Sequence, residues 1–474
     1  MLIGRENEKK QLLEALDSYE SQFVAVYGRR RVGKTFLIRQ TFNENFAFQH
    51  TGLAKGNKAE QLLEFQESLR KYGLKKSRKI TSWQEAFHRL SDLLESKPEG
   101  KKVVFIDEMP WLDTPQSKFI SALEHFWNGW ANMRTDIVLI ICGSATSWIV
   151  KKIILDYGGL HNRLTRKIQL KPFTLSECEE YCNARNLALS RKDIAEAYMV
   201  LGGIPYYWNY LKKEESLAQN IDEMLFAETA PLKMEYQALY ASLFKNSASH
   251  IAVVEALAQK SAGMSRMELL ETTRLTDNTA FAKVLEELEQ SAMIRKYYPY
   301  DKKERGATYQ LMDNFTLFYN RFVKSNINND GHFWSNNLST STHSTWAGLA
   351  FEQVCLQHIA QIKQALGISG VLSQVYSWRT QATASHDGAQ IDLLIDRGDN
   401  VVNVCEMKFV NDVFAIDKDY DALLRRKVSV FKQATKARKS VHLTMVTTYG
   451  LSRNAYFGNV QSEVVLDDLF VDLR

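Results

Sequence analysis

The feature that most constrains the fold is a glycine-rich segment near the N-terminal end, with the spacing GxxxxGK[ST]. It consists of Gly28, Arg29, Arg30, Arg31, Val32, Gly33, Lys34 and Thr35. Backbone N–H groups in such a loop point inward around phosphate oxygens, and side chains at the glycines would obstruct them. An apolar run at residues 23–27 precedes the loop, and a helical pattern follows at residues 34–42. The sequence therefore predicts a strand, a phosphate-binding loop and a helix in that order.

The residues of this loop have distinct expected roles toward ATP and its Mg²⁺. Lys34 can reach the β- and γ-phosphates, and the hydroxyl of Thr35 can ligate Mg²⁺. The N-terminus of the following helix adds partial positive charge. We assign the segment from Gly28 to Thr35, together with Phe36, to the nucleotide site. The alternative is a degenerate loop that binds nothing, and the flanking strand and helix argue against it.

A second chemical element follows the apolar run at residues 103–106, where Asp107 and Glu108 stand at the expected end of a strand. Ligands of parallel sheets collect at this carboxyl edge. Asp107 would hold the water shell of Mg²⁺, and Glu108 would polarise the water that attacks the γ-phosphate. The alternative is that both carboxylates only cap the next element.

Two further polar groups are candidates for sensing or assisting hydrolysis. The third apolar strand ends near Ser144 and Thr146, where a polar side chain could lie between Glu108 and the γ-phosphate. Gly-Ser is also a common turn, so the serine alone does not decide the role. Arg163 and Arg166 precede the next predicted strand, and either could supply charge to the γ-phosphate of a neighbouring subunit. Solvated arginines are the alternative.

Apolar runs bounded by glycine and separated by helical patterns predict an α/β domain with a parallel sheet covered on both faces. At 474 residues the chain exceeds one hydrophobic core, so we expect several domains. No apolar stretch is long enough for a membrane span. The net charge of +5 permits contact with nucleic acid without requiring it, and the five scattered cysteines suit a reducing cytoplasm. We expect a cytoplasmic protein without a membrane partner.

Four motifs together resemble the prokaryotic AAA-like proteins called archaeal-type ATPases. They are Gly-Arg-Arg-Arg-Val-Gly-Lys-Thr, Phe-Ile-Asp-Glu-Met-Pro, Ile-Cys-Gly-Ser and the later Gly202-Gly203-Ile204-Pro205. The resemblance spans nearly the whole chain, because the usual C-terminal domain of that family is recognisable too. It implies ATPase activity and a P-loop NTPase fold of the ASCE, AAA-like type. It also implies that the Gly-Gly-x-Pro turn belongs to a helical lid that closes on the nucleotide, and it implies no physiological substrate.

The middle of the chain has the element order of a winged helix. Three helices are predicted at residues 251–259, 265–272 and 277–290, followed by a hairpin at residues 293–311. The third helix is acidic, with Asp277, Glu286, Glu287 and Glu289 against Lys283 and Asn278. This charge would repel DNA phosphate, so we favour a structural or protein-contact role over sequence-specific DNA reading. A basic wing could still touch a nucleic-acid backbone through Lys302, Lys303 and Arg305.

The C-terminal part carries a second candidate site on two predicted strands. Asp392 lies on the first strand, and Glu406 and Lys408 lie on the next, two residues apart and therefore on one face. Asp392 and Glu406, with Glu352 on the preceding helix predicted at residues 346–366, could hold Mg²⁺ or Mn²⁺, while Lys408 could orient the attacking water. The set resembles the Glu…Asp…Glu-x-Lys residues of PD-(D/E)XK nucleases, which implies a restriction-endonuclease-like α/β fold. Ordinary solvated strand faces also carry such residues.

These patterns divide the chain into five predicted parts. They are a P-loop ATPase core (1–173), a helical lid (174–248), a winged-helix domain (249–325), a polar linker (326–344) and a nuclease-like domain (345–474). A basic stretch at residues 418–439 would suit a nucleic-acid backbone or form a solvated helix face.

The leading hypothesis is an ATPase whose nucleotide state controls a metal-dependent, nuclease-like domain acting on DNA or RNA. A homo-oligomer or a protein partner is compatible with it. The first alternative is a regulatory ATPase with a catalytically silent C-terminal docking domain. The second is a nucleotide-gated DNA-binding regulator that acts through the winged helix.

Overall fold

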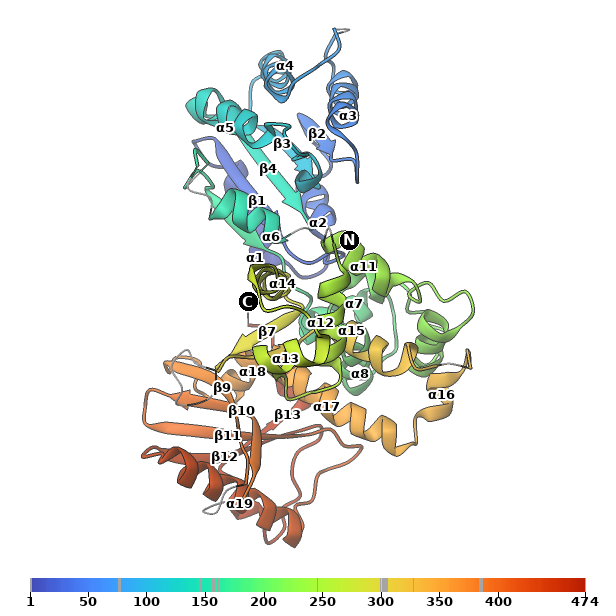
Figure 1. The fold of residues 1–474 in the computed structure, drawn as a ribbon, viewed down its shortest axis with the longest axis vertical. Helices are drawn as coiled ribbons and strands as arrows, with labels where there is room; N and C mark the ends of the chain where they lie inside the picture. The colour runs from blue at the N-terminus through green and yellow to red at the C-terminus, as the bar shows by residue number, and fades with distance from the viewer. Residues whose placement is uncertain are drawn as a thin grey trace. The chain divides into compact units, whose positions relative to one another are not determined.

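The computed structural model describes residues 2–473 except 76–77, 145, 156–157, 161, 245, 299, 301–305, 327 and 383–386. The chain forms two compact units (Figure 1). The first comprises Met1–Pro172 with the short segment Ala241–Lys245, and the second comprises Phe173–Tyr240 with Asn246–Leu473. The predicted tip of the wing, with Lys302, Lys303 and Arg305, lies outside the described residues.

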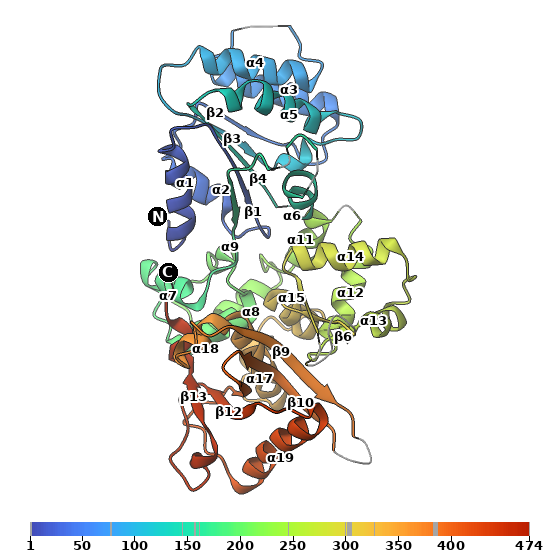
Figure 2. The same ribbon diagram turned by 90° about the vertical axis from the view of Figure 1, so that its left-hand side faces the viewer.

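The first unit is built on a five-stranded sheet in which every neighbouring pair is parallel. In spatial order the strands are β2 (Phe48–Thr51), β3 (Lys102–Asp107), β4 (Ile137–Gly143), β1 (Gln22–Tyr27) and β5 (Arg166–Gln169) (Figure 2). All residues of β3 and β4 are buried, as expected for a parallel sheet covered on both faces. The predicted α/β class with a parallel sheet is confirmed.

Helices on one face of this sheet supply the larger core. They are α3 (Lys58–Lys71), α4 (Trp83–Glu95) and α5 (Phe119–Gly129). Phe23 and Ala25 of β1 belong to the same core, whereas the equally buried Val24 and Val26 point to the opposite face. There α1 (Glu6–Leu16) contacts β1 and β5, and it packs against α2 (Lys34–Thr41), which contacts β4. Each fully buried large apolar side chain stabilises the folded state by about 1.5–3 kcal/mol. The helices on both faces therefore stabilise the sheet.

The strand order brings the predicted nucleotide residues together. Strand β4 lies between β1 and β3, so the carboxyl ends of these three strands meet at one edge of the sheet. The loop after β1 contains the glycine-rich motif, the end of β3 carries Asp107, and Ser144 follows β4. After Ser144 the chain forms α6 (Thr146–Ile149), a short helix that runs into a π-helical turn.

The second unit begins with helices on either side of the Gly-Gly-Ile-Pro turn. They are α7 (Leu175–Ala184), α8 (Arg191–Leu201), α9 (Pro205–Trp208) and α10 (Leu217–Ile221), and the later α11 (Glu235–Leu243) completes the helical stretch predicted in this region. Gly202 ends α8 with a φ of 61°, and Pro205 begins α9. A Cβ on Gly203 would stand 2.0 Å from the carbonyl oxygen of Phe173, so this turn requires glycine there.

Three helices and a hairpin follow, as the sequence predicts. The helices are α12 (Ala248–Ala258), α13 (Arg266–Thr273) and α14 (Thr279–Gln290), and the strands are β6 (Met264–Ser265), β7 (Ile294–Tyr297) and β8 (Thr308–Leu311). The three strands form one antiparallel sheet in the order β6-β8-β7.

Part of the segment predicted as a polar linker is helical. After α15 (Asn314–Phe318) the chain forms α16 (Phe333–Asn337), and α17 (Ser341–Gln357) begins five residues before the helix start predicted at residue 346. Trp334 is buried and packs edge-on against Phe318 and Trp346. The backbone N–H of Trp334 donates to the carboxylate of Asp222 at 2.7 Å. A single buried tryptophan among asparagines and serines thus anchors a segment whose composition suggests exposure.

The long helix predicted at residues 346–366 is broken at His358, where α17 ends and α18 (Ile359–Ala365) begins. The Nδ1 of His358 lies 2.8 Å from the Val354 carbonyl, and the backbone N–H of Leu175 donates to Nε2 at 3.1 Å. The ring is therefore neutral, with its proton on Nδ1. Burial lowers the pKa of His358 to about 4. This histidine joins the C-terminal helices to α7.

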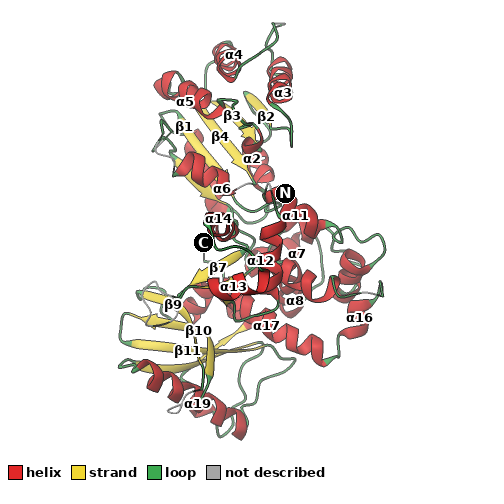
Figure 3. Ribbon diagram, viewed as in Figure 1, coloured by secondary structure: helices red, strands yellow, loops and turns green. Residues whose placement is uncertain are grey.

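The C-terminal part is a five-stranded mixed sheet (Figure 3). Its order is β13 (Ser462–Val465), β12 (Ser440–Thr447), β11 (Val401–Lys408), β10 (Ala389–Arg397) and β9 (Ser373–Thr380). The pairs formed by β9, β10 and β11 are antiparallel, and the other two pairs are parallel. Helix α19 (Lys418–Thr435) packs on the face of Val402 and Val404, burying Leu424 and Phe431. Most of the basic stretch is thus an amphipathic helix with one buried face. Helix α17 contacts β11.

In the part of the chain that the structure describes, no helix is long and apolar enough to cross a bilayer. All five cysteines are buried.

We expect Gly203→Ala to lower Tm by several degrees, because the added methyl group would overlap the backbone of Phe173. Overpacking of this kind costs about 1–3 kcal/mol. The matched control is Gly348→Ala in α17, where a Cβ meets nothing within 4 Å. That change should leave Tm unchanged or raise it, since alanine favours helix. Thermal melts of the full chain measure both, and equal Tm values for the two variants would contradict the assignment of strain to Gly203.

Candidate nucleotide site and C-terminal acidic cluster

The glycine-rich loop takes a backbone path that depends on its two glycines. Gly28 has a φ of 148°, and a Cβ there would stand 2.2 Å from the carbonyl oxygen of Leu170. Gly33 has a φ of 95° and caps the N-terminus of α2. A Cβ at Gly33 would meet no atom within 4 Å, so its glycine is required by conformation rather than by space. The loop therefore leads directly into the N-terminus of α2, as an anion site of this type requires.

Lys34 is folded back over this loop. Its Nζ donates to the carbonyl oxygens of Gly28 and Arg29, each at 2.9 Å, and the residue is only 5% exposed. Burial lowers the pKa of Lys34, while Glu108 and Asp107 act in the opposite direction. Among the described residues no carboxylate forms a salt bridge with it. A buried ammonium held by carbonyl dipoles gains stability when an anion binds beside it, so the loop fits a phosphate group.

Thr35 and Asp107 meet across the sheet edge. The hydroxyl of Thr35 donates to Oδ2 of Asp107 at 2.8 Å, and Oδ1 accepts the backbone N–H of Glu108 at 2.9 Å. Asp107 is 5% exposed. A hydroxyl and a carboxylate in contact provide the hard oxygen ligands that Mg²⁺ prefers, so these residues fit the ion that accompanies ATP.

Glu108 adopts an unusual backbone conformation. Its φ of 45° lies in the left-handed region, which costs about 1–3 kcal/mol for a residue other than glycine. The hydroxyl of Ser144 lies 3.0 Å from both carboxylate oxygens, and the Ser144 N–H is 3.4 Å from Oε2. The strained turn and the serine together fix the direction of the carboxylate.

The remaining residues assigned to this site differ in exposure. Arg29 and Val32 are buried, and Phe36 is 48% exposed on the first turn of α2. Arg163 is exposed in the turn after Leu160. Arg166 is the first residue of β5, not a residue before the strand, and it forms an ion pair with Glu14 of α1 at 3.2 Å. The structure brings Lys34, Thr35, Asp107, Glu108 and Ser144 together, and it leaves Arg163 as a surface residue.

In the C-terminal part, Glu406 is held by two residues of α19. Lys427 Nζ lies 2.7 Å from Oε2, and the Tyr420 hydroxyl donates to Oε1 at 3.0 Å. Lys408 Nζ is 3.8 Å from Oε1 and 4.8 Å from the centre of the Tyr420 ring. Sequence reasoning missed Tyr420 and gave Lys427 no specific role. The available signal was their spacing of seven residues, which places both on one face of a helix.

The charge of Glu406 acts on both Glu352 and Asp392. Burial, together with the charges of Asp392 and Glu406, raises the pKa of Glu352 to about 8. Burial also raises the pKa of Asp392, whose Oδ1 accepts a 2.7 Å hydrogen bond from Gln390. The three predicted metal ligands thus form one acidic cluster. Within the described ranges, however, no three His, Cys, Asp or Glu side chains have the arrangement of a metal site.

Comparison with known proteins places the nucleotide site in a family context. Residues 2–211 match a family model described as "ATPase domain predominantly from Archaea". The N-terminal part of the chain is an ATPase domain. The prediction of an archaeal-type ATPase is confirmed at this level, and the match ends before the acidic cluster. The nuclease-like assignment therefore stays a prediction.

Alignments with similar proteins cover more of the chain, at low sequence identity. The "Uncharacterized protein MJECL04" of Methanocaldococcus jannaschii is 24% identical over 420 residues, which are 83% of this chain and 84% of that protein. The "walker-type ATPase PABY2304" of Pyrococcus abyssi has a TM-score of 0.47 and 20% identity over 68% of this chain and 96% of its own. The ORC2 protein of Aeropyrum pernix has a TM-score of 0.42 and 13% identity, with shares of 67% and 93%. The assignment of the ATPase domain rests on the family match.

The raised pKa of Glu352 predicts a pH-dependent stability. Between its usual value of 4.5 and about 8, the folded chain keeps a proton that the unfolded chain releases. This contribution to stability is complete below pH 4.5 and is lost as the pH rises toward 8. Glu352→Gln removes the titration, so its Tm relative to wild type should increase from pH 5 to pH 8 in EDTA.

Thermal melts at several pH values measure this difference, with Glu64→Gln on the exposed surface of α3 as the control. The control should follow the wild type at each pH. A constant Tm difference between Glu352→Gln and wild type would contradict a protonated Glu352 in the folded chain.

Proposed function

We propose that the chain is an ATP-hydrolysing AAA-like protein whose nucleotide state controls a metal-dependent, nuclease-like C-terminal domain acting on nucleic acid. The observation that carries the proposal is the convergence of two polar pairs at one sheet edge. Thr35 bonds Asp107, and Ser144 bonds Glu108, beside a buried lysine in a glycine-rich loop. A structural turn would not need a buried ammonium and a strained glutamate at the same place.

Each residue of the ATPase site has a distinct proposed role. Lys34 neutralises charge on the phosphates, and Thr35 and Asp107 hold Mg²⁺, which supplies further positive charge there. Glu108 accepts a hydrogen bond from the attacking water and orients it toward the phosphate. Ser144 keeps the Glu108 carboxylate in position. Arg163 is exposed, which suits a residue that reaches a neighbouring subunit, as the sequence predicts.

Two substitutions separate binding from hydrolysis. We expect Lys34→Ala to abolish ATP hydrolysis, because the buried positive charge of the loop is lost. Glu108→Gln should still bind ATP but hydrolyse it about 10²–10⁴-fold more slowly, the usual contribution of a positioned general base. Binding of a fluorescent ATP analogue and release of phosphate measure the two properties. Normal turnover in Lys34→Ala, or lost binding in Glu108→Gln, would contradict the assigned roles.

The acidic cluster supports the nuclease-like half of the proposal. Glu352, Asp392 and Glu406 would hold Mg²⁺ or Mn²⁺, which would activate a water molecule for attack on a phosphodiester. Lys408 would stabilise the charge that develops on the phosphate. Burial raises the pKa of Glu352 and of Asp392, and a divalent cation would favour the charged forms of both carboxyls. Lys427 must leave Glu406 for a metal to bind there.

The same Lys427–Glu406 ion pair favours a second candidate function. In the described arrangement an ammonium already occupies the position next to Glu406. If the Lys427–Glu406 ion pair never opens, no metal can bind at Glu406. The C-terminal part would then be a docking domain without catalytic activity in a regulatory ATPase. Metal-dependent cleavage therefore distinguishes the two functions.

The middle part is proposed to be a winged-helix domain with a protein-contact role rather than a sequence reader. In α14, the acidic Glu287 lies 3.0 Å from His250 and 3.7 Å from Lys283. Asp277, just before that helix, is bonded to Arg266. The acidic surface of the third helix would repel a DNA backbone.

We expect Lys408→Ala to remove Mg²⁺- or Mn²⁺-dependent cleavage while leaving ATP hydrolysis largely intact, because Lys408 lies in the acidic cluster and not in the ATPase domain. The assay incubates DNA and RNA with the full chain, with and without ATP and Mn²⁺. Lys432→Ala, an exposed position on α19, is the matched control and should cleave normally. Absence of cleavage by the wild type under every condition would favour the docking function.

A further inference from the structure

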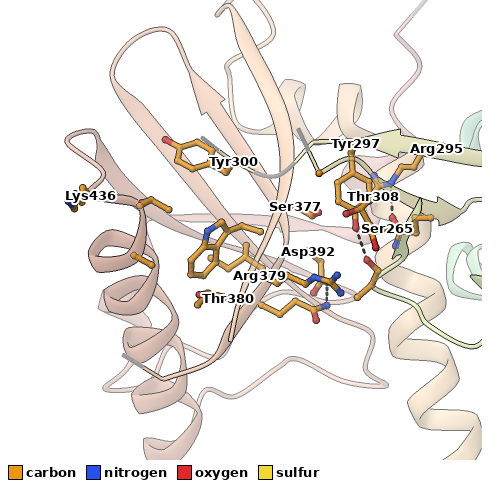
Figure 4. Close-up of a pocket in the computed structure, with 18 residues that line it drawn as sticks. Ser265, Arg295, Tyr297, Tyr300, Thr308, Ser377, Arg379, Thr380, Asp392 and Lys436 are labelled. Atoms are coloured by element: carbon orange, nitrogen blue, oxygen red, sulfur yellow. Dashed lines mark hydrogen bonds between the residues drawn. The ribbon is translucent and has the colours of Figure 1, made fainter. Parts of the chain in front are cut away.

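A cavity of about 550 Å³ separates the hairpin of the middle part from the edge of the C-terminal sheet (Figure 4). Strands β7 and β8 form one wall, and β9, the start of β10 and the end of α19 form the other. Cavities of about 300–1,000 Å³ accommodate small-molecule ligands. Asp392 of the acidic cluster lines the same cavity.

The wall is rigid because the two parts share a hydrophobic core. Tyr300, which follows the hairpin strand β7, is buried in the core of the C-terminal sheet, where it packs on Phe431 at 5.2 Å and edge-on against Tyr376. Trp378 of β9 also packs edge-on against Phe431, at 5.3 Å. Both aromatic residues line the cavity. Their positions are therefore fixed before any ligand arrives.

A half-buried cation points to an anionic ligand. Arg295 of β7 lines the cavity, and in the described part of the chain its guanidinium donates only through Nε, to Gln310 Oε1 at 2.7 Å. No described carboxylate lies within salt-bridge distance of it. Burial lowers the pKa of Arg295 to about 10, although the charge of Asp392 opposes that shift. In the described part of the chain this half-buried guanidinium keeps its terminal N–H groups available, and such groups are well suited to bind phosphate oxygens in a bidentate manner.

Other groups of the lining suit the remainder of a nucleotide. Arg379 and Lys436 add positive charge at the exposed rim. Trp378 and Tyr300 are 7% and 8% exposed, and the part of each ring that reaches the cavity is apolar contact area for a base. The amide of Gln390 offers hydrogen bonds to base edges. Among the described residues that line the cavity, Asp392 is the only carboxylate, and burial raises its pKa. The cavity thus combines an anion site, an aromatic wall and amide groups.

We propose that this cavity binds a nucleoside phosphate, with its phosphate on Arg295 and its base against the aromatic wall of Trp378 and Tyr300. The ligand is either a free nucleotide or one unpaired nucleotide of a single strand, and the two share this chemistry. In the second case a strand would enter the acidic cluster as single-stranded nucleic acid, since a base inside a duplex is not accessible to such a cavity. Only this second case, in which a strand enters the acidic cluster, rests on the proposed nuclease-like function.

The test measures binding by the full chain in EDTA, where no cleavage occurs. A fluorescein-labelled single-stranded oligonucleotide is titrated by anisotropy and compared with an abasic oligonucleotide of equal length and charge. We expect the strand with bases to bind at least about tenfold more tightly, because stacking of bases on aromatic side chains is worth that factor. Nucleoside monophosphates are then added as competitors. Competition by free monophosphates identifies the free nucleotide as a ligand, and binding of the strand without such competition identifies the strand.

Three variants locate the binding. Arg295→Gln and Trp378→Leu should each weaken binding about tenfold. Arg379→Gln, at an exposed position that lies 3.6 Å from Glu268, should weaken it too. Lys432→Gln, at an exposed position of α19 outside the cavity, should bind as the wild type does. Tm values confirm that the variants are folded.

Equal binding of abasic and base-containing strands by the wild type would overturn the proposal. So would unchanged binding in Arg295→Gln and Arg379→Gln. Loss of metal-dependent cleavage with nucleotide binding intact would contradict only the proposed nuclease-like function, so the two failures are distinguishable.

Discussion

The parallel pairing of β4 between β1 and β3 is the constraint on which the ATPase site depends. Parallel strands all end at one edge of a sheet, so the residue after each strand is brought to the same place by the backbone alone. The hydrogen bond between Thr35 and Asp107 links positions 72 residues apart, and that between Ser144 and Glu108 spans 36. Neither pair needs its own loop to hold it, because helices on both faces keep the strands buried and in register.

The sequence predicted this half of the molecule well because its signals are local. Apolar runs ending in glycine or acid mark the strands, and the GxxxxGK[ST] spacing is imposed by the geometry of one loop. The failures involve information that lies far away in the chain. The helix at Trp334 depends on Asp222, and the break at His358 depends on a hydrogen bond from Leu175. Composition and periodicity describe neighbouring residues, so they carry no information about partners that are distant in the sequence.

The C-terminal cluster was predicted in part for the same reason. The two-residue period of a strand was sufficient to bring Lys408 to Glu406, and the pattern correctly marked β10 and β11. The edge strands β9 and β13 were missed, because their residues are mostly half-exposed and show no long apolar run. The role of Lys427 was not visible from sequence either, since a basic helix has many lysines and only packing selects the one that reaches a carboxylate.

The backbone at Glu108 has a consequence for how this chain balances stability against activity. Glycine or asparagine would occupy its left-handed conformation at lower cost, so the chain carries at that position a residue that works against its own folded state. The proposed role of the Glu108 carboxylate in orienting water would account for this cost, whereas packing does not. Selection for thermal stability alone would therefore favour replacement of Glu108 by glycine or asparagine. The fold would be kept, but the carboxylate proposed to orient water would be lost.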